Sequence, residues 1–98
     1  MLIKDSITKT IQDYFSNKPV NNVWLFGSFA RNDFDEKSDV DILVDIDFTN
    51  MKSGWDFVKW HLDIEKLIAR KVEVVSTGGL NERIRPYVEK DKQLIYAK

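Results

Sequence analysis

One stretch, residues 25–44, constrains this chain more than any other. An apolar run ends at Gly27 and Ser28, a polar loop follows, and apolar and polar residues then alternate over 39–46. This pattern predicts a strand, a tight turn, a short helix over about 29–32 and a second strand over 39–46. Two strands joined by so short a connection are expected to belong to one sheet.

The second of these strands carries two carboxylates, Asp39 and Asp41. Residues two positions apart in a strand point to the same face, so both acids are expected on one face of the sheet. The residues expected on the other face, in a core, are Val40, Ile42, Val44 and Ile46. Adjacent acids repel unless cations lie between them, and Mg²⁺ is held by carboxylates together with substrate phosphates. The acid pair therefore predicts a metal site.

The turn before the short helix has the composition of a phosphate-binding site. Gly27 lets the backbone approach a bulky anion, the helix start presents free N–H groups, and the Ser28 hydroxyl adds a donor. Together with the acid pair, this predicts metal-assisted phosphoryl or nucleotidyl transfer. Arg31 has two interpretations: it approaches a phosphate or a site acid, or it is solvated or forms a salt bridge with Asp33 or Asp35.

These residues carry a resemblance to a known family. Gly27-Ser28-Phe29-Ala30-Arg31, followed by Ser38-Asp39-Val40-Asp41-Ile42-Leu43-Val44, resembles the nucleotidyltransferase signature G-S-x-A-R…S-D-x-D-[IL]-x-V. The chain is similar to the minimal nucleotidyltransferases (MNT), relatives of the polymerase-β catalytic domain. Asn32 stands where the family usually has glycine, and asparagine tolerates left-handed backbone geometry better than most residues.

The remaining segments follow the order of elements in that family. The expected elements are helices over 4–16, 54–70 and 80–92, strands over 23–26 and 71–76, and an edge strand or packed segment over 94–96. Ser53 and Asp56 fit a capping box, and Pro86 is expected to kink or split the last helix. We therefore expect one domain, 1–98, of the α/β (α+β) class: a polymerase-β-like fold with a small mixed sheet flanked by about four helices.

The apolar stripe of the predicted helix over 54–70 is wider than one sheet face usually covers. Either the helix is a core helix with aromatic residues sealing its edges, or Trp55, Val58 or Leu62 contacts another chain. The candidates for that chain are a partner protein and a second copy. His61 is expected to be packed or on the surface rather than a metal ligand.

The resemblance implies a third metal ligand and a reaction. In the family, the strand corresponding to 71–76 carries a third metal-binding acid, usually Asp, and this chain has Glu73 there. The family implies two Mg²⁺ ions, ATP as substrate, and transfer of AMP to a tyrosine of a HEPN toxin, for which the MNT protein is the antitoxin.

The Glu73 and Asn32 changes favour an alternative, a weak or inactive module that binds nucleotide or a partner. A third reading is a small-molecule nucleotidyltransferase of the antibiotic-modifying sort.

Composition excludes several other classes. A formal net charge of −1 gives no basic footprint for a long nucleic acid. No cysteine is present, which excludes disulfides and thiolate metal sites and agrees with a reducing cytoplasm. No apolar run approaches the roughly 20 residues that a membrane span needs. The first six residues lack a basic region and a long apolar run, so we expect no secretory leader.

Overall fold

The computed structural model describes residues 3–98. Residues 1 and 2, which the single-domain prediction also covers, lie outside that range. A four-stranded sheet has the order β3-β2-β1-β4. Its strands are β1 (Val20–Phe26), β2 (Val40–Ile46), β3 (Val72–Ser76) and β4 (Gln93–Ala97), and the helices are α1 (Ile3–Phe15), α2 (Ser28–Arg31), α3 (Trp55–Ile68) and α4 (Arg85–Asp91), with a 3₁₀ turn over Thr77–Gly79. The predicted fold, a small mixed sheet with four helices, is confirmed.

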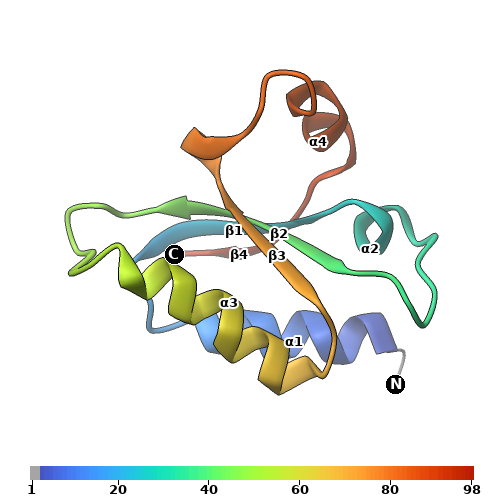
Figure 1. Cartoon of the computed structure of the whole chain (residues 1–98), viewed down its shortest axis with the longest axis horizontal. Helices are drawn as coiled ribbons and strands as arrows, with labels where there is room; N and C mark the ends of the chain where they lie inside the picture. The colour runs from blue at the N-terminus through green and yellow to red at the C-terminus, as the bar shows by residue number, and fades with distance from the viewer. Residues whose placement is uncertain (1–2) are drawn as a thin grey trace.

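The elements form layers about the sheet (Figure 1). Helices α1 and α3 lie on one face and α4 lies on the other. Strand β1 is antiparallel to both β2 and β4, whereas β2 and β3 are parallel. A parallel pair needs a long crossover, and α3 provides it. Because β2 and β3 are neighbours running in the same direction, residues that start each strand lie side by side.

The main core lies between the sheet and the helices α1 and α3. All four residues of β2 predicted to face a core are at most 8% exposed. They pack in one cluster with residues of α1 and α3, among them Ile11, Phe15, Trp60 and Ile64. The alternation of β2 thus fixes which of its faces is covered by α1 and α3, and Asp41 is directed to the opposite face.

A second, smaller core lies on that opposite face under α4. It consists of Phe26, Leu43, Leu80 and Val88. Phe26 is 8% exposed although it ends the strand, so this part of β1 is covered on both faces of the sheet. Since Leu43 shares a face with Asp41 on β2, this core holds α4 next to the acid.

Several element boundaries differ from the predicted ones. Strand β1 starts at Val20 instead of 23, because Val20 is fully buried and pairs with Ile46. Strand β2 starts at Val40, so Asp39 is the last residue of the preceding loop. The helix predicted over 80–92 is shorter: α4 starts at Arg85, with Pro86 in its first turn where a missing N–H costs nothing. The segment over 94–96 is confirmed as part of an edge strand, β4.

The predicted capping box of α3 is wrong. Gly54 is the N-cap residue, and it has no side chain with which to cap. The Ser53 hydroxyl accepts a hydrogen bond from the Trp55 N–H at 3.2 Å, one position earlier than a capping box requires. The helix ends at Ile68, followed by Ala69 in the left-handed conformation with φ of 55°.

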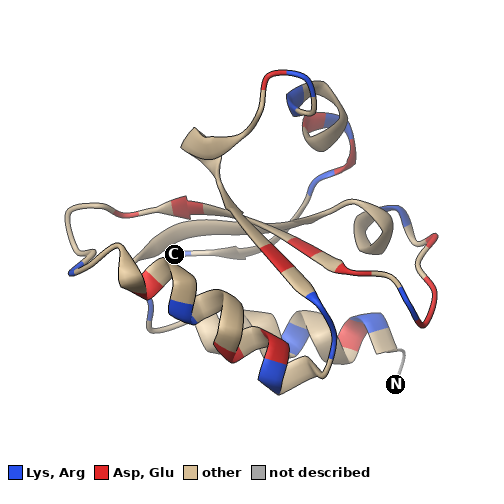
Figure 2. Ribbon diagram, viewed as in Figure 1, with Lys and Arg blue, Asp and Glu red and all other residues tan. Residues whose placement is uncertain are grey.

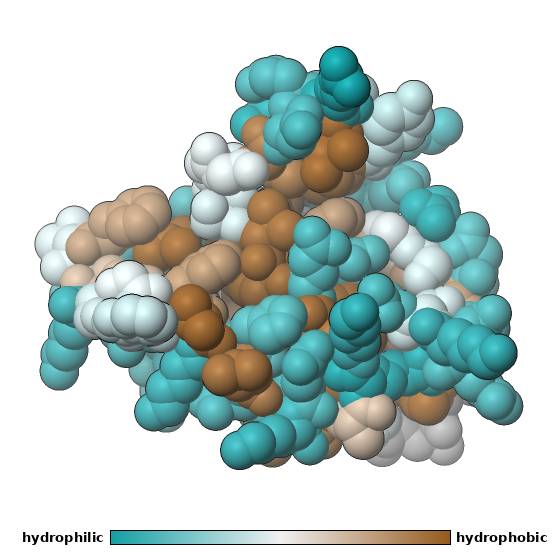
Figure 3. Space-filling model, in the orientation of Figure 1, coloured by the Kyte–Doolittle hydropathy of each residue, from teal (hydrophilic) through white to brown (hydrophobic). Residues whose placement is uncertain are grey.

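The outer face of α3 carries exposed apolar side chains interspersed with charged ones (Figure 3). Trp55 is 79% exposed, and Val58, Leu62 and Leu67 are also exposed. A role of this face as an interface stays a prediction. None of the helices in residues 3–98 has the length and apolar character required to cross a bilayer.

The two tryptophans of α3 allow a matched test of the core. Trp60 is 2% exposed and packs edge-on against Phe15, with ring centroids 5.6 Å apart. We expect Trp60→Ala to lower the free energy of unfolding by about 3–5 kcal/mol, because it leaves a cavity. Trp55→Ala, on the same helix but exposed, is expected to change it by less than about 0.5 kcal/mol. Urea unfolding followed by circular dichroism measures both; equal losses would contradict this account of the core.

Candidate functional site

The site is built where the end of β1 meets the start of β2. Phe26 is the register partner of Asp41, so Gly27 lies directly beside the acid. Gly27 has φ of 71°, a conformation that L side chains rarely adopt. A Cβ atom at this position would also overlap the Asp41 Oδ2 atom. Glycine is therefore required at this position for two reasons: its backbone conformation and the close approach of the Asp41 carboxylate.

The third acid lies on the neighbouring strand. Asp41 and Glu73 are register partners in the parallel pair β2–β3. Their preceding neighbours, Val40 and Val72, are both buried in the main core, so the two acids share the other face of the sheet. Acidic segments of the two strands lie side by side in Figure 2. The structure thus brings Glu73 next to Asp41, with Asp39 at the end of the loop just before β2.

The pKa of Asp41 is affected by its burial and by the neighbouring acids. Its pKa is raised to about 6, first by burial and then by the negative charges of Glu73 and Asp39; Arg31 acts in the opposite direction. Carboxylates that raise one another's pKa are stabilised as anions by a nearby cation. The site therefore holds more negative charge than its surroundings compensate.

The arrangement supplies the chemistry of a metal site but not a closed cage. Among residues 3–98, no three His, Cys, Asp or Glu side chains gather closely enough to hold an ion as they lie. Asp39 and Glu73 are exposed, whereas Asp41 is held against Gly27. Carboxylate oxygens are the protein ligands that Mg²⁺ prefers. Oxygen donors of this kind are the type of ligand that a hard divalent cation takes.

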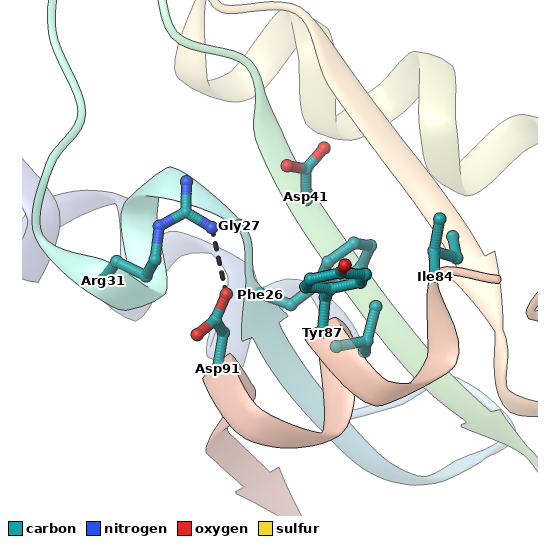
Figure 4. Close-up of a pocket in the computed structure, with 8 residues that line it drawn as sticks. Phe26, Gly27, Arg31, Asp41, Ile84, Tyr87 and Asp91 are labelled. Atoms are coloured by element: carbon teal, nitrogen blue, oxygen red, sulfur yellow. Dashed lines mark hydrogen bonds and ion pairs between the residues drawn. The ribbon is translucent and has the colours of Figure 1, made fainter.

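Arg31 forms two ion pairs, one of which the sequence indicated. Its Nε lies 3.0 Å from an oxygen of Asp33, and its Nη1 lies 3.0 Å from an oxygen of Asp91 on α4 (Figure 4). Both carboxylates raise the pKa of the guanidinium. Asp35, the other partner considered from the sequence, is engaged in its own loop. Asp91 was missed, because nothing in the sequence relates two residues so far apart.

The loop that carries Asp39 is fixed from both sides. The Asp35 carboxylate accepts a hydrogen bond from the Lys37 N–H at 2.8 Å and another from the Ser38 hydroxyl. Both hydrogen bonds lower the pKa of Asp35. Arg70, just after α3, donates from Nη1 to the carbonyl oxygens of Asp35 and Ser38, at 2.9 and 3.1 Å. Arg70 thus ties the end of α3 to the residue next to Asp39. The sequence pattern gave no sign of this relation between Arg70 and the loop before Asp39.

Helix α2 is closed by Asn32 in place of the family's glycine. Asn32 has φ of 65°, the left-handed conformation expected for it, and its side-chain oxygen accepts a hydrogen bond from Lys4 Nζ at 2.8 Å. Asn32 therefore adopts the left-handed conformation that a glycine adopts readily. Ser28 is the first residue of α2 and is half-buried beside Gly27.

A cavity of about 180 Å³ opens beside Gly27, Arg31 and Asp41 (Figure 4). Helix α4 forms one wall and the Gly27 bend forms the other. The lining residues are Phe26, Gly27, Arg31, Asp41, Ile84, Tyr87, Val88 and Asp91. The contribution of α4 was missed from the sequence, where the apolar residues of this segment showed helical spacing but no relation to the acids.

Comparison with known proteins agrees with this geometry. The family model described as "Polymerase beta, Nucleotidyltransferase" matches residues 9–98. A Methanocaldococcus jannaschii protein named "Putative protein adenylyltransferase" is 31% identical over 96 residues, which cover 96% of this chain and 93% of that protein. A solved structure described as a "putative minimal nucleotidyltransferase" is 26% identical, with a TM-score of 0.71 and 95% of each chain covered.

A second solved structure shows the fold in a complex. It contains a tri-AMPylated Shewanella oneidensis HEPN toxin with an MNT antitoxin. The likeness has a TM-score of 0.64 and covers 98% of this chain and 71% of that one. At 14% identity, this likeness shows the fold alone.

The crowding of the acids predicts a measurable titration. In metal-free protein, Asp41 is expected to titrate near pH 6, and Glu73→Gln is expected to lower that pKa, because it removes a like charge. Asp45→Asn, further along β2, is the control and leaves the Asp41 pKa unchanged. Carboxyl ¹³C NMR measures all three proteins. An Asp41 pKa near its ordinary value of 3.8 in the wild type would contradict the description.

The same shift fixes the sign of a stability effect. Because the pKa of Asp41 is higher in the folded state than in the unfolded chain, where it is about 3.9, the folded state binds more protons between these values. The contribution of Asp41 to the free energy of unfolding therefore falls as pH rises from about 4 to about 6, and the loss is complete above that range. Comparing the free energies of unfolding of wild type and Asp41→Asn across this pH range isolates the contribution of Asp41.

Proposed function

The chain belongs to the polymerase-β nucleotidyltransferase family, and from this we propose that it transfers AMP from ATP to a hydroxyl group of a partner protein. The observation that carries the proposal is the position of Asp41, held between the Gly27 bend and Glu73 of the next strand. One side of the acid is a bend fit for phosphate, and the other side is an open sheet edge. This is the arrangement that a reaction between a triphosphate and an incoming hydroxyl requires.

Asp39, Asp41 and Glu73 are the residues that would hold Mg²⁺, two ions if the chain follows its family. When bound, Mg²⁺ neutralises charge on the triphosphate and stabilises the charge that develops during transfer. The pKa of Asp41 is raised first by burial and then by repulsion from Glu73 and Asp39, and this repulsion supports the assignment, since a divalent cation would relieve it.

The bend is assigned to the β- and γ-phosphates. Gly27 lacks the side chain that would otherwise fill the space beside Asp41, and Ser28 contributes its N–H and hydroxyl at the start of α2. Arg31 lines the same cavity and supplies positive charge. Arg31 is paired with Asp91, so contact with a phosphate requires it to exchange that partner.

In the proposed reaction, the acceptor oxygen attacks the α-phosphorus, a new P–O bond forms, and the bond to the β-phosphate oxygen breaks. Pyrophosphate leaves. Glu73 is exposed on β3, an edge strand, and is the acid that an acceptor hydroxyl meets first. We assign to it the proton of that hydroxyl. Asp41, packed against Gly27, is less accessible to the acceptor.

The proposed acceptor is a tyrosine of a HEPN toxin, for which this protein would be the antitoxin. Two relatives support this choice. The Methanocaldococcus jannaschii relative carries the name of a protein adenylyltransferase, and the solved complex contains an AMPylated HEPN toxin with an MNT antitoxin.

A second candidate function is a partner-binding module that neutralises the toxin by contact alone. Two observations favour it: glutamate replaces the family's usual aspartate at residue 73, and the acids among residues 3–98 form no closed cage. The two functions differ in whether the toxin is modified covalently.

The test uses ATP labelled at the α-phosphate, Mg²⁺ and a HEPN protein from the same genome. Wild type is expected to transfer label to the HEPN protein, and ATP labelled at the γ-phosphate is expected to transfer none. Asp39→Asn combined with Asp41→Asn is expected to reduce transfer by at least about 100-fold. Asp45→Asn, on the same strand, serves as the matched control with near-normal transfer. Neutralisation of the toxin without any transfer of label by wild type would favour the module.

A further inference from the structure

The cavity over the site has two chemically different halves. Its polar half is formed by the Gly27 bend, Arg31 and acids. Its apolar half is formed by Phe26 of β1, by Ile84, which is the N-cap residue of α4, and by Tyr87 and Val88 of α4. Phe26 and Val88 are buried and form the floor, so the apolar half is a stable part of the fold.

Two residues of this apolar half are exposed rather than packed. Tyr87 is 71% exposed and Ile84 is 43% exposed, although Val88 packs this same helix against the sheet. None of the aromatic pairs in the described chain includes Tyr87. In Figure 4 the Tyr87 side chain projects from α4 into the space below Asp41. Its ring therefore has a face available to a ligand.

The size of the cavity indicates what fits. An apolar cavity of about 150 Å³ holds a benzene ring, and pockets for complete drug-sized ligands are about 300–1,000 Å³. At about 180 Å³, this cavity accommodates one flat ring system but not a whole nucleotide. The phosphates of such a ligand would lie at the polar half, along the bend at Gly27, and would extend beyond the cavity.

The position of the cavity distinguishes donor from acceptor. It is lined by the residues assigned to phosphate, Gly27 and Arg31, and not by Glu73. Glu73 lies on the other side of Asp41, on the strand farther from β1. A ring in the cavity would thus belong to the molecule whose phosphates occupy the bend, rather than to the molecule that approaches Glu73.

We propose that the apolar half of the cavity is the subsite for the nucleobase of the donor nucleotide, with the base stacked on the exposed ring of Tyr87 and bordered by Ile84. This inference rests on the proposed function, because it takes the bend at Gly27 as the phosphate site. Every nucleobase has a π-face, so the stack gives affinity without choosing among bases.

The experiment compares two probes by calorimetry in the presence of Mg²⁺: ATP, which has a base, and inorganic tripolyphosphate, which has none. Tyr87→Ala is expected to raise the Kd for ATP about tenfold, the effect of losing one stacked base, and to leave the Kd for tripolyphosphate unchanged. Tyr87→Phe keeps the ring and is expected to bind ATP like wild type. Trp55→Ala, which removes an equally exposed aromatic from the opposite layer, is expected to change neither.

The outcomes separate this inference from the function on which it rests. If wild type binds ATP and Tyr87→Ala binds it equally well, the base subsite is wrong and the proposed function stands. The same conclusion follows if Tyr87→Ala weakens both probes equally, or if it lowers transfer without changing the Kd for ATP. If wild type binds neither probe, the proposed function fails, and the subsite fails with it.

Discussion

The structure depends on one contact, the packing of the Asp41 carboxylate against the bare Cα of Gly27. It joins the end of β1 to the start of β2 and brings an acid to the bend that we propose as the phosphate site. No other residue type serves at position 27, because a side chain would both strain the backbone and displace the acid. A negative charge beside the proposed phosphate site is unfavourable without cations, and for this reason we propose that the acids bind a metal.

The remainder of the fold holds that contact in place from both faces of the sheet. On one face, α1 and α3 bury the alternating apolar residues of β2, which fixes Asp41 on the other. There, the small core around Phe26 and Val88 anchors α4, and α4 brings Tyr87 and Asp91 to the rim of the cavity. Arg70 fixes the loop before Asp39. The two cores therefore differ in role: the larger orients the acid, and the smaller shapes the space around it.

The parts of the site that could be predicted are those with a local rule. Alternation placed Asp41 opposite the core, and the tolerance of asparagine for left-handed backbone explained Asn32. The position of Glu73 beside Asp41 followed from resemblance to a family. Asp91, Arg70 and Tyr87 were missed, because their relation to the site is set by packing between segments remote in sequence. The helix cap at Ser53 was wrong because two adjacent residues, serine and glycine, both suit an N-cap.

The central claim is that the three acids gather divalent ions beside the bend. The most direct measurement is the loss of amide NMR signals on adding Mn²⁺ in small amounts, because a paramagnetic ion broadens nearby nuclei. The account predicts that broadening begins at residues 27, 39, 41 and 73. Broadening centred instead on acids elsewhere, such as Asp47 or Asp56, or spread evenly over the surface, would contradict it.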